Sequence, residues 1–172
     1  LAAPQGYQIW TSDADGANRD RVAAHADHLY FGTSWSPDGR SIVFSWDAEG
    51  AFDVYRREIG TGGEPSPLLV NGVWKFPESW SPDGRRLTFQ LERDGAANLY
   101  SQPADGSGPV ERLTTSESYQ VPGSWSPDGR TLSYVQSHPV TGSDVWVLPL
   151  GGRATRAFED FEPTPLGPKW DG

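Results

Sequence analysis

One seven-residue motif, Ser-Trp-Ser-Pro-Asp-Gly-Arg, limits the possible folds of this chain more than any other feature. It begins at Ser34, Ser79 and Ser124, at a constant step of 45 residues. A shortened copy, Lys-Trp-Asp-Gly, occupies 169–172, and its Trp170 keeps the same step. Periods of about 20 to 50 residues are typical of stacked repeats, in which each unit leaves an apolar face for its neighbour to cover. The repeat is therefore the unit in which this chain has to be understood.

Each repeat predicts four short strands. An inner strand ends at the motif Trp, and a second strand follows the motif at 41–46, 86–91 and 131–135. A third and an outer strand form a hairpin, because Gly-rich or Asp-Gly turns separate two short β-like runs. These hairpins are predicted for 7–10 with 18–22, 53–55 with 67–70, 98–100 with 110–113, and 144–146 with 154–156. Gly and Pro interrupt every window long enough for an amphipathic helix, which excludes a helical solenoid.

Four-stranded units of this length are typical of propeller blades. We therefore expect an all-β fold, a β-propeller of four-stranded antiparallel blades, with three complete blades and partial blades at both ends. The third and outer strands of a partial blade are placed at 6–25, and the inner strand of a further blade at 162–172. The complete blades are placed at 28–70, 73–114 and 118–158.

The two partial blades leave two arrangements open. Either the ends meet and close a small four-bladed ring, or the chain is a segment of a larger ring that other chain segments or another subunit complete. We expect the second, because a closed ring would leave the last blade without its second strand, and short open edges tend to be paired.

The composition excludes several classes of partner. The net charge is −9, so attraction to nucleic acid or to an anionic membrane surface is not expected. No apolar run reaches the roughly 20 residues that cross a bilayer, so no membrane span is predicted. Cysteine is absent, which excludes disulfides and thiolate metal sites. Nothing in the sequence indicates a cofactor.

The motif itself is predicted to have a structural role. Pro presets φ, Asp accepts backbone hydrogen bonds and Gly adopts a conformation that a side chain resists, so Ser-Pro-Asp-Gly predicts a tight turn. The Trp is expected to wedge between neighbouring blades, with its indole N–H bonded at the turn. The residues given this structural role are Trp35, Asp38, Gly39, Trp80, Asp83, Gly84, Trp125, Asp128, Gly129 and Trp170.

No catalytic or metal site is predicted. A nucleophile elbow would read Gly-x-Ser-x-Gly, and Gly123 to Pro127 fails at the last position. The three histidines, His25, His28 and His138, are too scattered for a zinc site. The Asp-rich segment at 13–18 resembles a calcium loop, but it lacks the closing Glu and predicts a hairpin turn instead. Acidic residues between second and third strands, at Asp47, Glu49, Glu92 and Asp94, are ordinary turn residues that could form at most an acidic patch.

The segments that lead into the inner strands differ between repeats, whereas the scaffold positions agree. Variation on one loop face usually reflects binding. The candidates on this loop face are His28, Tyr30, Trp74, Lys75, Tyr119 and Gln120, of which the aromatic members are expected to be partly exposed. Exposed aromatic side chains are typical anchors of protein interfaces. The alternative is that these residues only plug the mouth of the central channel.

The motif, the apolar strand after it, and the Asp/Asn-apolar-aromatic strand with its Asp-Gly hairpin resemble the WD-like repeat of TolB-type propellers. The resemblance runs from Tyr7 to Gly172, although Ser-Pro is missing from the last copy. It implies a non-catalytic, periplasmic or extracellular module of bacteria that binds a protein or peptide. The same repeat also occurs in prolyl-oligopeptidase-like peptidases, which leaves a substrate-gating propeller of a hydrolase as one alternative and a structural subunit of a larger assembly as another.

Overall fold

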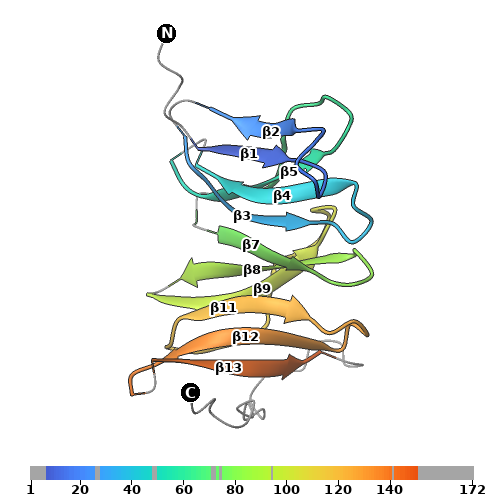
Figure 1. The fold of residues 1–172 in the computed structure, drawn as a ribbon. Coiled ribbons are helices and arrows are strands. Elements are labelled where there is room, and N and C mark those ends of the chain that lie inside the picture. Colours follow the sequence, from blue (N-terminus) through green and yellow to red (C-terminus); the bar gives the residue numbers. More distant parts are fainter. Residues whose placement is uncertain are drawn as a thin grey trace. The chain divides into compact units, whose positions relative to one another are not determined.

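The computed structural model describes residues 7–25, 28–47, 50–70, 73, 75–93, 95–140 and 142–150. The regular secondary structure of these residues consists of β-strands (Figure 1), which confirms the all-β prediction. The chain divides into two compact units, Leu1–Pro77 and Glu78–Gly172, and the boundary falls within one strand.

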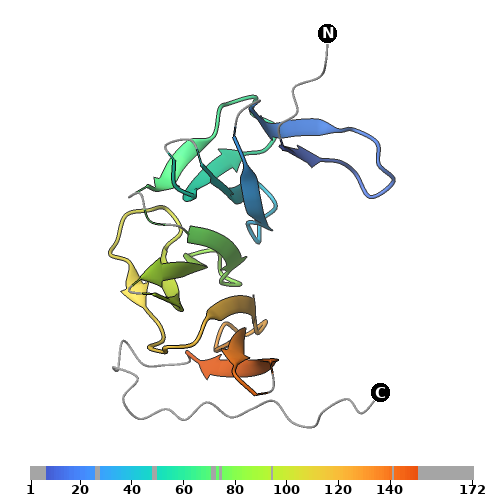
Figure 2. The same ribbon diagram turned by 90° about the vertical axis from the view of Figure 1, so that its left-hand side faces the viewer.

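The strands form four sheets, each of which corresponds to one repeat. The first sheet is a hairpin of β1 (Gln8–Thr11) and β2 (Asp20–Ala24), drawn in blue in Figure 2. The second contains β3 (Tyr30–Trp35), β4 (Ser41–Trp46), β5 (Asp53–Glu58) and β6 (Ser66–Leu69) in that order. The third contains β7 (Lys75–Trp80), β8 (Arg86–Arg93), β9 (Ala96–Pro103) and β10 (Glu111–Arg112). The fourth contains β11 (Gln120–Trp125), β12 (Thr131–His138) and β13 (Gly142–Pro149).

The pairing of these strands confirms the predicted hairpins wherever both arms are described. The register joins β1 to β2, β5 to β6 and β9 to β10, all antiparallel. The predicted partner of β13, at 154–156, and the predicted inner strand at 162–172 lie outside the described residues. Each inner strand forms one edge of its sheet, where Gly and Pro disturb the pairing least.

The Gly at this edge has a clear steric reason. In β3 the pairing with β4 shifts register between Phe31 and Ser34, so the strand bulges around Gly32. Gly32 has a φ of 53°, and a Cβ there would lie 3.1 Å from the carbonyl oxygen of Pro77. Any larger residue would therefore press against the start of β7.

Each unit has a core between two sheets. In the first unit, Ile9, Val22 and Ala23 of the first sheet form one buried cluster with Tyr30, Ile42, Phe44 and Tyr55 of the second sheet. In the second unit, Leu99 of the third sheet packs with Leu132, Tyr134 and Leu148 of the fourth. Burial of one such side chain stabilises the fold by about 1.5 to 3 kcal/mol. Ile42 and Phe44 of β4, and likewise Leu132 and Tyr134 of β12, lie two residues apart and so share one buried face of their sheet.

The motif turns are the same in all three copies. In the first, Ser36 Oγ donates to Asp38 Oδ1 at 2.6 Å and accepts from the Ser41 amide at 2.9 Å, while Asp38 Oδ1 also accepts from the Arg40 amide at 3.0 Å. The Gly of each copy adopts a positive φ, between 68° and 71°. The turns at Ser81 and Ser126 repeat every one of these bonds. The predicted roles of Asp and Gly are therefore confirmed.

The motif Trp residues, by contrast, are not equivalent. Trp125 packs against the core between the third and fourth sheets, and its indole N–H donates to Thr88 Oγ1 on the preceding sheet at 3.0 Å, not to the turn. Trp80 is buried, with 8% of its surface exposed, whereas Trp35 is 47% exposed. The predicted wedge holds for Trp125 and is wrong for Trp35. Trp170 lies outside the described residues.

Candidate functional site

Those predicted binding residues that the structure describes lie where the inner strands begin. We call this the start end of each sheet. In the second sheet Tyr30 pairs with Trp46, and Trp46 with Asp53, so the loop between β4 and β5 lies at the same end. In the fourth sheet Gln120 pairs with Gln136, and Gln136 with Asp144. The start end therefore combines two kinds of loop in each sheet.

Tyr30, Lys75 and Gln120 occupy the same repeat position, and all three are buried. The Tyr30 ring meets Phe44 edge-on and stacks on Trp46, with centroid distances of 5.8 and 5.9 Å. Burial, with a smaller contribution from the Asp47 carboxylate, raises the pKa of the Tyr30 hydroxyl. The expected partial exposure of Tyr30 is wrong, because its ring completes the core of the first unit.

Gln120 is buried with both ends of its amide bonded. Its Oε1 accepts from Thr114 Oγ1 at 2.5 Å, and its Nε2 donates to Gln136 Oε1 at 2.6 Å. Buried polar groups are stable only when they are satisfied in this way. In this conformation the side chain supports the start of β11 and offers no surface to a partner.

Lys75 is fully buried and forms an ion pair. Its Nζ lies 2.6 Å from Asp53 Oδ1 and donates to the Val73 carbonyl at 2.5 Å. Desolvation lowers the pKa of Lys75, and the Asp53 carboxylate opposes that shift. The Lys75 amide also donates to the Phe52 carbonyl at 2.9 Å, and Ser45 Oγ donates to the Lys75 carbonyl at 2.6 Å. Lys75 thus fixes the start of β7 to the second sheet.

Sequence reasoning missed Asp53 as the partner of Lys75, although a signal was present. Asp53 and Asn98 stand 45 residues apart, the first at the start of β5 and the second two residues into β9. Asn98 performs the corresponding task in the next repeat, where its Oδ1 accepts from the Ser116 amide at 2.7 Å and its Nδ2 donates to the Ser116 carbonyl at 3.2 Å. A polar residue at this repeat position therefore marks where the connection to the following inner strand is held.

His28 and Tyr119 remain closer to the solvent. His28 Nδ1 lies 3.2 Å from Asp47 Oδ1, which also accepts from the Leu29 amide at 2.8 Å. Tyr119 is exposed, and its hydroxyl accepts a hydrogen bond from Gln90 Nε2. Trp74, Glu49 and Asp94 lie outside the described residues. Within the described part of the chain, no cluster of three or more His, Asp or Glu side chains could hold a metal ion.

An aromatic cluster lies at the start end of the first unit. The ring of Phe31 contacts Tyr7, Phe52 and Phe76, with centroid distances of 6.1, 5.2 and 6.5 Å, and Phe52 lies 5.7 Å from Phe76. Phe52 is buried, whereas Tyr7 and Phe31 are exposed. The sequence places Phe31 and Phe76 at one repeat position, but it does not reveal that Tyr7 and Phe52 join them. We call these four residues the aromatic cluster.

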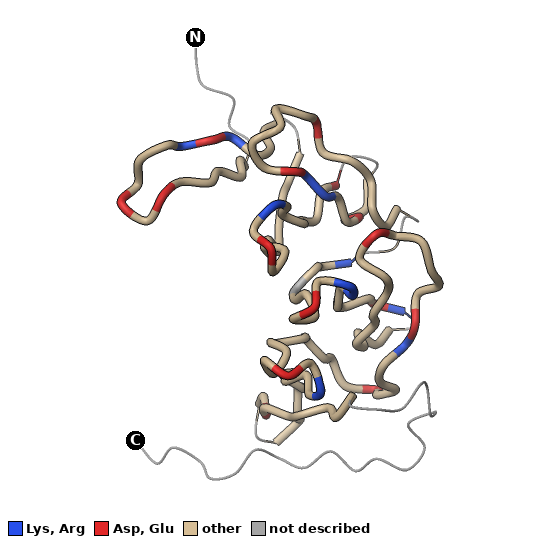
Figure 3. The backbone as a smooth tube through the Cα atoms, turned by 90° about the vertical axis from the view of Figure 1, so that its right-hand side faces the viewer, with Lys and Arg blue, Asp and Glu red and all other residues tan. Residues whose placement is uncertain are grey.

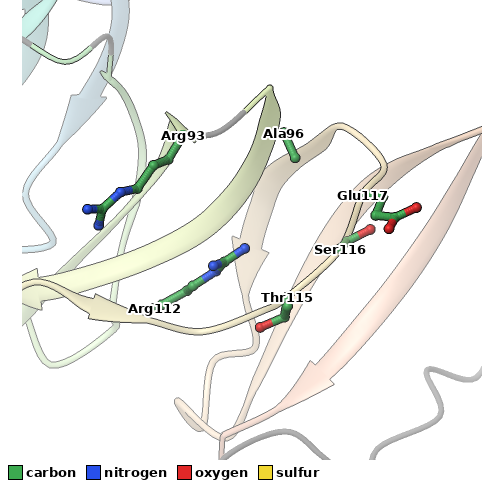
Figure 4. A pocket seen from close by; sticks show the side chains of 6 residues that line it. All are labelled: Arg93, Ala96, Arg112, Thr115, Ser116 and Glu117. Atoms are coloured by element: carbon green, nitrogen blue, oxygen red, sulfur yellow. The ribbon is translucent and has the colours of Figure 1, made fainter.

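The second unit has a shallow hollow at the start end of the third sheet. Its volume is about 330 Å³, and Figure 4 shows its lining: Arg93, Ala96, Arg112, Thr115, Ser116 and Glu117. The Arg112 Nε donates to the Thr114 carbonyl at 2.8 Å, and its guanidinium lies 5.9 Å from the centre of the Tyr100 ring. Positive and negative residues are interspersed along the described chain in Figure 3. The lining of the hollow, with two Arg and one Glu, has mixed charge.

The described residues form antiparallel sheets of up to four strands, and three of these sheets have an edge strand that leads into a Trp-containing turn and recurs every 45 residues. This arrangement defines a β-propeller module. Comparison with known sequences agrees. The profile of the TolB beta propeller domain family matches residues 2–160, and the chain belongs to this family.

Several known proteins resemble the chain in sequence or fold. The Tol-Pal system protein TolB of Francisella tularensis is 43% identical over 56 residues, which are 33% of this chain and 13% of that protein. The crystal structure of TolB from Acinetobacter baumannii superposes with a TM-score of 0.73 at 20% identity, over 84% of this chain and 35% of that one. A TolB-type protein from Agrobacterium tumefaciens gives a TM-score of 0.68 at 28% identity, over 86% and 53%. The chain thus spans only part of each relative.

Two further predictions from the sequence concern the cellular location and membrane spans. TolB homologues are periplasmic proteins of the Tol-Pal system, in agreement with the periplasmic location that the resemblance implies. Among the described residues, none belongs to a helix long and apolar enough to cross a membrane.

Proposed function

We propose that this chain is a non-catalytic propeller module that binds a protein or peptide at the start ends of its sheets. The observation that carries the proposal is the aromatic cluster, in which a buried ring, Phe52, holds the exposed ring of Phe31 in place. Contiguous exposed apolar surface of this kind is typical of interaction sites, because aromatic side chains add contact area at little cost in conformational entropy.

The packing of the cluster also supports binding by a prearranged surface. Phe31 contacts three other rings, so its position is already fixed before a partner arrives. A fixed anchor loses less conformational freedom on association than a free side chain does. Tyr119, held by Gln90, presents a second exposed ring at the start end of the fourth sheet. We include Trp74 in the proposed surface on sequence grounds.

The relatives support a protein partner over a substrate. The Francisella relative is named as a protein of the Tol-Pal system. A puromycin-hydrolyzing peptidase from Mycobacterium tuberculosis also superposes, with a TM-score of 0.62 at 16% identity over 82% of this chain and 22% of that one. At that identity the likeness shows the fold alone, and it assigns no hydrolase role to this chain.

The proposal can be tested by measuring binding of purified soluble Tol-Pal proteins, and of a displayed random peptide library, to the immobilised chain. Phe31→Ala should weaken binding at least about tenfold, which corresponds to about 1.4 kcal/mol. Tyr119→Ala and Trp74→Ala should weaken it as well, and all three variants should keep the circular dichroism spectrum of the native chain.

Trp35→Ala is the matched control. Trp35 and Phe31 lie at opposite ends of β3 and are similarly exposed, at 47% and 43%. If the proposal is right, only the Phe31 variant loses binding. Equal losses, or no loss for Phe31, Trp74 and Tyr119, would show that partners bind elsewhere.

A further inference from the structure

The third sheet brings two Arg residues to one face at the hollow shown in Figure 4. Arg93 of β8 pairs with Ala96 of β9, and Arg112 of β10 pairs with Tyr100 of β9. Ala96 and Tyr100 lie four residues apart on one strand, so they share a face of the sheet with both of their partners. Arg93 and Arg112 therefore line the hollow together, on either side of the small Ala96.

The carboxylates next to these Arg residues in the sequence belong to the opposite face. Glu92 precedes Arg93 on β8 and Glu111 precedes Arg112 on β10, and successive side chains of a strand alternate between faces. Glu111 Oε2 already accepts from Arg86 Nη2 at 2.6 Å. With the described carboxylates, neither Arg93 nor Arg112 forms an ion pair. Both charges are thus available to an anion.

Arg112 is held by its inner atoms, whereas its outer atoms stay available. Its Nε donates to the Thr114 carbonyl at 2.8 Å, and its guanidinium lies 5.9 Å from the centre of the Tyr100 ring. Its two Nη groups donate to no other described residue. A fixed guanidinium with an unbonded edge matches the two oxygens of a carboxylate, because two parallel N–H groups can donate to them at once.

Ser116 adds a hydroxyl donor to the lining. Asn98 fixes its backbone, since Asn98 Oδ1 accepts from the Ser116 amide at 2.7 Å and Asn98 Nδ2 donates to the Ser116 carbonyl at 3.2 Å. Ser116 Oγ accepts from the Ser118 amide at 3.0 Å, so its hydrogen is available to a ligand oxygen. Glu117 is exposed, and in Figure 4 its carboxylate points away from the Arg112 side chain.

The two Arg residues are a special feature of the third repeat. One period of 45 residues earlier, the places of Arg93 and Arg112 are taken by Ala48 and Pro67. Neither of those side chains carries a charge. Residues that differ between repeats on a loop face usually reflect binding and not the needs of the fold.

The charges favour a ligand with a single negative charge. The chain has a net charge of −9, which disfavours polyanions such as nucleic acid. Glu117 in the lining repels a second negative charge on the ligand. A phosphate monoester carries about two negative charges near neutral pH, whereas a carboxylate carries one. A carboxylate therefore fits this hollow better than a phosphate does.

We propose that the hollow binds one carboxylate of a protein partner, between the Nη groups of Arg112 and the Ser116 hydroxyl, with Arg93 adding positive charge. For the nature of the partner the inference rests on the proposed function, because the hollow lies at the start end of the third sheet. The carboxylate belongs to an Asp or Glu side chain or to the carboxyl end of a chain, and both sources present the same two oxygens.

NMR titration of the native chain with small probes tests the site and distinguishes the two sources. The Nε–Hε signal of Arg112 should shift with N-acetylglutamic acid α-amide, which has a side-chain carboxylate, or with N-acetylalanine, which has a terminal one. The probe that binds more tightly identifies the source. The neutral N-acetylglutamine amide should cause no shift. Tighter binding of N-acetylphosphoserine amide than of both carboxylates would overturn the proposal.

Three variants, followed on the Ser116 amide signal, test the assigned residues. Arg112→Gln should weaken binding of the tighter carboxylate at least about tenfold, because it removes two hydrogen bonds to a charged group. Arg93→Gln, which changes an exposed side chain, should weaken binding less and serves if the Arg112 variant loses the native circular dichroism spectrum. Arg130→Gln is the matched control, because it removes the same charge from an exposed Arg of a motif turn. It should bind like the native chain.

The outcomes separate this inference from the proposed function, because the probes need no partner protein. Carboxylates that bind no better than the glutamine probe, or equal losses in the Arg112 and Arg130 variants, would overturn the inference. If Phe31→Ala nevertheless loses partner binding, the proposed function stands. If Phe31→Ala, Trp74→Ala and Tyr119→Ala all keep full binding while the carboxylates still shift the Arg112 signal, the proposed function fails and the carboxylate site stands.

Discussion

The motif turns and the first positions of the inner strands recur with the same period, but they differ in their residues. The turns keep the same residues in each repeat, whereas the inner-strand position changes its residue from repeat to repeat. The turns repeat the same residues and the same hydrogen bonds three times. The first inner-strand position carries Tyr30, Lys75 and Gln120, three different chemical types, and buries all of them. Residues that are identical in all repeats therefore lie where the backbone conformation determines the residue type. Residues that differ between repeats lie where the packing of the neighbouring sheet determines it.

The physical reason lies in what each site demands. A turn with a positive φ at its fourth residue needs Gly, and its free amides need the carboxylate of Asp. These two demands restrict the residue types at the turn, which agrees with the identity of the three copies. A buried side chain needs only complementary volume and satisfied polar atoms, which a ring, an ion pair or an amide network can each supply.

The largest expected effect concerns the motif Trp residues, which are identical in sequence but differ in their surroundings. Trp80→Ala should lower the free energy of unfolding by about 3 to 5 kcal/mol, as large-to-small changes in packed interiors do. Trp35→Ala, in an identical motif, should cost only about 1 to 2 kcal/mol, because half of that side chain already contacts water. Urea denaturation of the two variants measures the difference. Similar losses would mean that identical motif residues also have identical surroundings.

A somewhat smaller effect is expected at the first inner-strand position. Lys75→Gln should destabilise the chain by about 3 kcal/mol, because it leaves the Asp53 carboxylate buried without its partner. The double variant Lys75→Gln/Asp53→Asn should recover most of this loss, since the next repeat has Asn98 and Gln120 at these two positions. Denaturation curves of the single and double variants provide the test. A double variant no more stable than the single one would show that the ion pair cannot be exchanged for neutral groups.

The smallest effect concerns the turns and their dependence on pH. The Ser hydroxyl, followed by the Arg amide, lowers the pKa of Asp38, Asp83 and Asp128 below the ordinary value. A lowered folded-state pKa contributes stability above the unfolded pKa of about 3.9, and this contribution is lost as pH falls through the folded value. Carbon NMR titration of the carboxyl groups should show all three shifts. Ser81→Ala should return the pKa of Asp83 toward normal and leave Asp38 unchanged. A shift that survives in the variant would refute the assigned cause.

The sequence predicts most of the fold because its signals are local. The turn residues, the alternation of Ile42 and Phe44, and the Asp13 to Gly16 hairpin each act within one repeat, and the structure agrees with all of them. Contacts between sheets cannot be predicted in this way, because the sequence of one repeat does not show which residues of the neighbouring sheet it meets. Such contacts determine the exposure of Trp35, the burial of Tyr30 and the cluster around Phe52.

The ion pair between Lys75 and Asp53 also bears on how a repetitive chain assembles in the right order. Near-identical repeats are prone to misassembly, in which a strand docks beside the wrong neighbour. Lys75 can neutralise Asp53, whereas Gln120 in its place would leave a buried carboxylate without a counter-charge. Asn98, in turn, carries no charge that would compensate a buried ammonium group. A single pair of charges thus distinguishes correct from incorrect sequential docking, in a protein whose turns are otherwise interchangeable.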